Sequence, residues 1–221
     1  MKNTVRCLLV AALLANAIPT TARADVIRDW NQNMLDAALV PPATNPLVMT
    51  RVAAIVESAV FDAVNGIERR YTPIHVEPAA PRGASRRAAA VQAAYATLVI
   101  LYPAQQSTLA ARRTDSLAEI AATENSRSIT RGIQWGQTVA DGILAWRGTD
   151  GFTPPPPPFV GSIDVGKWRP TPPAFLPGAG PQFATMTPWA INSPSQFRPA
   201  GAGMAGWILR VVWRRKQWLP G

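Results

Sequence analysis

Cysteine and histidine are nearly absent from this chain of 221 residues, which contains only Cys7 and His75. One cysteine cannot form an internal disulfide, and one histidine cannot supply a histidine-rich metal centre. These two scarcities exclude disulfide scaffolds, cysteine zinc sites and multi-histidine metal sites as properties of this chain alone. We assign no metal-binding residue.

Apolar runs long enough to cross a membrane are also missing, because the longest one covers only residues 8–18. A membrane-spanning helix needs about 20 such residues. Two basic residues precede this run, and Ala-Arg-Ala at 22–24 follows it. That order is typical of a secretory signal. We therefore predict a signal peptide over residues 1–24, a mature chain from Asp25, and a secreted or periplasmic location.

Acidic residues do not occur after Asp164, although the chain holds 13 of them against 22 Lys and Arg. Three basic residues lie in the predicted signal. Four more lie in residues 200–221, a basic tail that also holds three of the eight tryptophans. Residues 25–199 therefore carry 15 basic and 13 acidic side chains, a net charge of only +2. This balance predicts no nucleic-acid partner for the body of the protein.

Helical patterns fill residues 25–149. Apolar side chains recur there with a period near 3.6, and Asp, Asn or Ser, which are preferred N-caps, precede most of the periodic segments. We predict an all-α fold, a helical bundle whose five helices begin after Asp25, Asn45 and Ser85, near Ser107, and after Ser126.

A ridge of small residues, Gly132, Gly136 and Ala140, lies on one face of the last predicted helix. Glycine inside a helix costs about 1 kcal/mol relative to alanine. We expect close approach of a neighbouring helix to offset this cost.

Proline dominates the next segment, since residues 150–199 contain 13 of the 22 prolines, including the run Pro154–Pro158. The segment also carries several aromatic residues and shows no strand alternation. We predict an irregular, extended Pro-rich arm that packs on the bundle.

Few side chains suggest chemistry. His75 lies in a predicted loop without a partner motif, and we interpret it as a surface or packing residue. Glu57 and Asp62 are five residues apart, so they do not share a helix face as an acid–base pair would. Asp62 and Asn65, three residues apart, are placed to brace the loop over residues 71–84.

Three cations of the arm, Lys167, Arg169 and Arg198, suit an oxyanion because guanidinium groups match phosphate-like ligands. A solvated surface is the alternative. The sequence therefore assigns no catalytic and no cofactor-binding residue.

Five segments in order resemble the bacterial vanadium-dependent haloperoxidase-related proteins of the type 2 phosphatidic acid phosphatase superfamily. The resemblance covers about residues 25–199. The segments are DVIRDWNQNMLDAAL (25–39), MTRVAAIVESAVFDAVNGIERRY (49–71), ASRRAAAVQAAYATLVILYP (84–103), GIQWGQTVADGILAWRGTDG (132–151) and GKWRPTPPAFLPGAGPQFATMTPWAINSPSQFRP (166–199).

The resemblance implies an all-helical bundle that binds vanadate, or phosphate in phosphatase relatives, with peroxide-dependent halide oxidation as the parent reaction. The family's oxyanion site comes from Lys-x6-Arg-Pro, Pro-Ser-Gly-His and Ser-Arg-x5-His segments. This chain contains none of them: Lys167 to Pro170 has the wrong spacing, and Pro194-Ser195-Gln196 does not match. Vanadate is thus implied by the resemblance alone.

We therefore expect this chain to be the N-terminal part of a larger bundle, inactive by itself, with a frameshift or early stop near Ala200 that explains the tail. Two other functions stay open: a non-catalytic secreted scaffold or binding module, and an acid phosphatase-like protein acting on phosphate esters. Uncovered helix faces predict association, including homo-oligomers.

Overall fold

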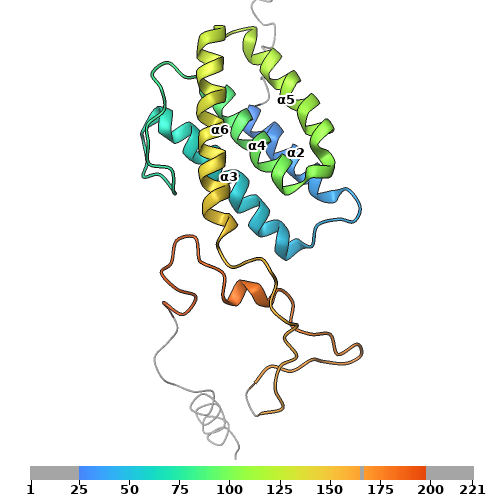
Figure 1. Ribbon diagram of the computed structural model, residues 1–221. Coiled ribbons are helices and arrows are strands. Elements are labelled where there is room, and N and C mark those ends of the chain that lie inside the picture. The colour runs from blue at the N-terminus through green and yellow to red at the C-terminus, as the bar shows by residue number, and fades with distance from the viewer. Residues whose placement is uncertain (1–24, 165–166, 198–221) are drawn as a thin grey trace, which may run out of the picture.

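The computed structural model describes residues 25–164 and 167–197 (Figure 1). The predicted signal peptide, Arg198 and the tail at 200–221 lie outside the described residues. Within the described part the fold is all-α, as predicted, with five α-helices and no β-strand. The helices are α2 (Val26–Leu39), α3 (Pro46–Glu68), α4 (Arg86–Leu101), α5 (Gln106–Ala121) and α6 (Ser126–Gly148).

Polar caps fix where the helices begin. Asp25 accepts a hydrogen bond from the backbone N–H of Ile27, and Asn45 accepts one from Leu47. Ser85 accepts one from Ala88, so three predicted starts are confirmed. These bonds satisfy backbone donors that have no partner within the helix.

The cap of α6 differs from the prediction. Asn125 is the N-cap and accepts a hydrogen bond from the backbone N–H of Ser128, whereas Ser126 is the first helical residue. Asn and Ser cap helices about equally well, so the sequence did not distinguish the two positions.

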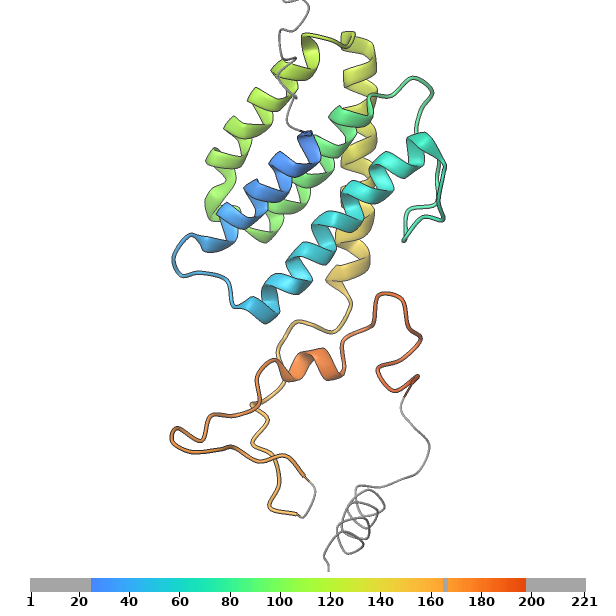
Figure 2. The ribbon, with the colours of Figure 1, turned by 180° about the vertical axis from the view of Figure 1, so that it is seen from behind.

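The central helix is α4, which packs against all four of the other helices (Figures 1 and 2). Nearly all of its side chains from Ala88 to Leu98 are buried. Six of these are alanines, which let neighbouring backbones come close on every side. Hydrophobic residues of α2 and α3, among them Trp30 and Val56, pack around Val91 and Leu98 to form the main core.

The closest helix contact joins α6 to α4. A Cβ added at Gly132 would lie 2.5 Å from the carbonyl oxygen of Ser85, and one at Gly136 would lie 2.4 Å from that of Ala89. Neither position has room for a side chain. The expected close approach at the small-residue ridge is confirmed, and α4 is the neighbour.

The fourth helix, α5, is the least buried part of the bundle. The apolar spacing of Leu109, Leu117, Ile120 and Ala121 predicts that all four are buried, but only Leu109 and Ile120 are. Leu117 is half-buried, and the prediction is wrong for Ala121, which is exposed in the last turn of α5, where the chain leaves the bundle before α6 begins.

The Pro-rich arm extends beyond one end of the bundle (Figures 1 and 2). It contains one short 3-10 helix, Pro181–Ala184, and one isolated bridge between Phe159 and Gly178. Several of its apolar side chains are exposed, including Phe175 and Leu176. Thr187 and Trp189 of the arm contact the end of α6, whereas Phe159 and Gly178 pair within the arm.

No helix of the described residues is both long and apolar enough to span a bilayer.

Candidate functional site: the junction of bundle and arm

The loop between α3 and α4 is held by one carboxylate. Asp62 is 1% exposed and accepts three backbone hydrogen bonds, from Ile74 (2.7 Å), His75 (2.9 Å) and Val76 (2.9 Å). Buried carboxylates need such partners to offset lost hydration. Asp62 therefore anchors the loop, as expected.

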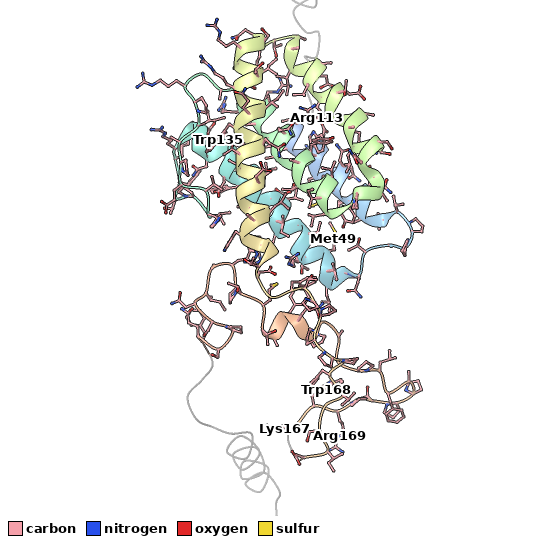
Figure 3. The ribbon with its side chains drawn as sticks, in the orientation of Figure 1. Met49, Arg113, Trp135, Lys167, Trp168 and Arg169 are labelled. Atoms are coloured by element: carbon pink, nitrogen blue, oxygen red, sulfur yellow. The ribbon has the colours of Figure 1, made fainter. Side chains whose placement is uncertain are left out.

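Asn65 completes this brace. Its amide donates to the carbonyl oxygen of Tyr71, and its own oxygen accepts from the backbone N–H of Tyr71. Next to it, a Cβ at Gly66 would lie 2.4 Å from the ring of Trp135, whose indole N–H donates to the Ala63 carbonyl (Figure 3). The Phe-Asp-Ala-Val-Asn-Gly stretch thus joins α3 to the loop and to α6.

Glu57 lies apart from Asp62. It lines a hollow of about 240 Å³ together with Phe61 and Val64 of α3 and Ile27 of α2, and partial burial raises the pKa of its carboxyl group. Asp62 instead points under the loop. The structure places these carboxylates in different surroundings, in agreement with their five-residue spacing.

His75 contributes its ring to an aromatic stack. The imidazole lies 4.5 Å from the ring of Trp146 with an interplanar angle of 10°. Trp146 in turn meets Trp189 of the arm edge to face, at 5.1 Å. In the described part of the chain, no three His, Cys, Asp or Glu side chains gather as metal ligands would. His75 is exposed, and its ring covers Trp146 near the end of α6.

Asp150 is the centre of the polar contacts at the end of α6, where the arm begins. Its Oδ2 accepts hydrogen bonds from Nε of Arg51 (3.0 Å) and Nη2 of Arg147 (2.7 Å). Arg147 also donates to the carbonyl oxygen of Thr187 (2.9 Å), and Arg51 donates to the carbonyl oxygen of Arg147 (2.8 Å). The backbone N–H of Thr187 donates to the Asp150 carbonyl at 2.7 Å. We call Arg51, Arg147, Asp150, Thr187 and Trp189 the junction cluster.

The junction cluster has a buried centre, Arg147 and Asp150, and holds one more cation than anion. Arg147 is 1% exposed and Asp150 4%. Burial lowers the pKa of Arg147, and Arg51 adds to this effect, while Asp150 opposes it. The Arg147 guanidinium lies 4.7 Å from the ring centre of Trp146 and 4.2 Å from that of Trp189. Such cation–π contacts favour the charged form in a desolvated site.

Two nitrogens of Arg147, Nε and Nη1, are buried without a hydrogen-bond partner among the described residues. Both belong to the guanidinium that the two indole rings contact. The contacts of this guanidinium with Trp189 and with the Thr187 carbonyl oxygen join the arm to the end of α6.

A turn at Gly148 to Gly151 ends α6 and leads into the arm. In this turn the Asp150 Oδ1 accepts a hydrogen bond from the backbone N–H of Phe152, and Gly151 has φ +84°. The role of Asp150 as a shared partner of two arginines was missed. Arg51 lies 99 residues before Asp150 in sequence, and no local pattern connects them.

The arm cations that suit an oxyanion, Lys167 and Arg169, do not lie beside the junction cluster. Lys167 and Arg169 are exposed on the arm, away from the bundle (Figure 3). The guanidinium of Arg169 donates to the carbonyl oxygen of Ile163 at 3.3 Å, and Arg198 lies outside the described residues. Arg51 and Arg147 are already committed to Asp150. The described residues therefore do not fit a bound vanadate.

Comparison with protein-family profiles, with characterised proteins and with solved structures finds no match for this chain.

Proposed function

We propose that this chain is a secreted or periplasmic, haloperoxidase-like helical scaffold that does not oxidise halides by itself. In this proposal the bundle supports the Pro-rich arm, and oxyanion chemistry would require Lys, Arg and His segments that this sequence does not contain. The family assignment rests on the resemblance of residues 25–199.

The observation that best supports the proposal is the junction cluster. Three of the five segments that carry the resemblance meet there: Arg51 comes from 49–71, Arg147 and Asp150 from 132–151, and Thr187 from 166–199. Segments far apart in sequence are thus joined by partly buried hydrogen bonds from charged side chains. This is what a scaffold that holds an arm in one position requires.

Peroxide-dependent bromide oxidation tests the proposal. The full chain, with added vanadate and hydrogen peroxide, should give no bromination of a phenolic acceptor above the rate of vanadate alone. Titration with vanadate should show no saturable binding. Turnover, or vanadate binding that is lost when Lys167 and Arg169 are replaced, would contradict it.

DNA sequence beyond the codon for Ala200 gives a second test. The haloperoxidase assignment expects Pro-Ser-Gly-His and Ser-Arg-x5-His segments in one of the other reading frames. Their absence would favour the alternative of a binding module without enzymatic ancestry. The exposed apolar side chains of the arm, including Phe159 and Phe175, are the observation that favours this alternative.

A further inference from the structure

One end of the bundle concentrates arginine. Residues 68–87 and 124–131 carry seven arginines and three glutamates, a surplus of four positive charges. The rest of residues 25–197 carries seven basic and ten acidic side chains, three net negative charges. We call this set the arginine pole. Its arginines are Arg69, Arg70, Arg82, Arg86, Arg87, Arg127 and Arg131.

Contacts between residues far apart in sequence show that these segments lie together. The backbone N–H of Ser85 donates to the carbonyl oxygen of Ser128 at 3.0 Å, which joins the starts of α4 and α6. Arg131 donates to the carbonyl oxygen of Arg82 at 2.7 Å. Arg86 pairs with Glu68 at the end of α3. Figure 1 shows the starts of α4 and α6 at the end of the bundle opposite the arm.

The arginine pole is open to solvent and only partly neutralised. Arg69, Arg70, Arg82, Arg86 and Arg127 are exposed. Glu68 is shared by Arg70 and Arg86, and Glu124 lies 4.0 Å from Arg87. Asp25, which borders the same hollow of about 330 Å³ as Arg86 and Arg87, offsets one further charge.

Helix polarity increases the positive potential. The first turns of α4 and α6 contain no acidic residue, and Arg86, Arg87 and Arg127 stand there instead. A helix N-terminus carries partial positive charge, so it favours acids and disfavours cations. Several arginines therefore stand at helix N-termini, where they are electrostatically unfavourable. We take this as an indication that their charge binds an anionic partner outside the bundle.

We propose that the arginine pole docks this protein on an anionic lipid surface. Guanidinium groups bind lipid phosphates, and clustered basic side chains are attracted to anionic leaflets. Tyr71, 69% exposed, directly follows Arg69 and Arg70, and tyrosine favours the membrane–water interface. A lipid surface suits this end of the bundle better than nucleic acid, because the exposed arginines are spread over the end of α3, the loop that follows it and the starts of α4 and α6 rather than aligned along one element.

Vesicle flotation of the full chain tests this proposal. We expect binding to phosphatidylcholine vesicles that contain phosphatidylglycerol and none to phosphatidylcholine alone. The variant R82Q/R127Q, which changes two exposed side chains, should bind about tenfold more weakly or worse. R82K/R127K keeps the charge and should retain most of the binding. K167Q/R169Q removes two exposed charges from the arm, and should bind like the unaltered chain.

The controls separate the arginine pole from the basic tail, which all these variants share. Equal loss in R82Q/R127Q and K167Q/R169Q, or no loss in either, would overturn the proposal and assign binding to net charge or to the tail. Binding to duplex DNA without binding to vesicles would overturn it too. Circular dichroism verifies folding. If R82Q/R127Q does not fold, release of the unaltered chain from vesicles by high salt is the expected result, and salt-insensitive binding contradicts the proposal.

Discussion

Asp62 shows how one buried carboxylate can hold a loop that has no regular structure. Replacing it with Asn keeps the size but leaves one oxygen to accept three backbone hydrogen bonds. We expect D62N to lower the free energy of unfolding by about 3 kcal/mol, since bonds to charged groups contribute about 1.5–3 kcal/mol each. Urea denaturation followed by circular dichroism measures the loss.

The matched control is D115N, which removes an exposed carboxylate of α5. It should change stability by less than about 0.5 kcal/mol. Similar losses in D62N and D115N would mean that Asp62 contributes only net charge.

Asp62 and Asn65 could be predicted as a brace from their three-residue spacing. The partners in the loop could not, because the hydrogen bonds form only when residues 74–76 fold back over α3.

The junction cluster is the second test at the scale of single residues. D150N removes the negative charge that the buried Arg147 and the partly buried Arg51 share, and breaking a buried ion pair costs about 3–5 kcal/mol. We expect the arm to detach from Trp146 and to become sensitive to limited proteolysis between residues 150 and 189. D164N, which alters an exposed carboxylate of the arm, should leave the cleavage rate unchanged. Equal protection of D150N and the unaltered chain would contradict the role of Asp150.

Helix packing depends on missing side chains at the contact between α4 and α6. G136A should gain about 1 kcal/mol in helix propensity, yet the added methyl would lie 2.4 Å from the Ala89 carbonyl oxygen. Overpacking of this kind costs about 1–3 kcal/mol or more, so we expect net destabilisation and a lower melting temperature. Thermal denaturation measures the change.

Gly148, in the same helix, is the control, because nothing lies within 4 Å of a Cβ placed there. G148A should be neutral or slightly stabilising. A stable G136A would show that α6 can shift away from α4.

At the scale of helices the sequence predicted much of the fold, since N-caps and periodicity located most helix starts. It did not reveal that α4 is central, because a run of alanines gives little directional signal and nearly every side of the helix is buried.

Charge and apolar surface are distributed unevenly over the whole molecule. The arginine pole escaped sequence analysis because its seven arginines are spread from residue 69 to residue 131 and meet only through the bundle. The near-neutral overall charge of residues 25–199 thus conceals a cationic end, where α4 and α6 begin. The arm, which carries several exposed apolar side chains, lies at the other end of the bundle (Figure 1).

The exposed side of the arm predicts self-association. Val160 and Leu176 are each 70% exposed, and Ile163 is 90% exposed. Large exposed apolar patches are uncommon on monomeric proteins and mark surfaces that bind. We expect the sedimentation coefficient of the full chain to rise with concentration and to fall back in F175S/L176S. L39S, which removes an exposed leucine from the end of α2, should not reduce association. A monomer at every concentration would show that the arm does not associate with itself. Equal effects of L39S and F175S/L176S would show that the contact between copies does not depend on the arm.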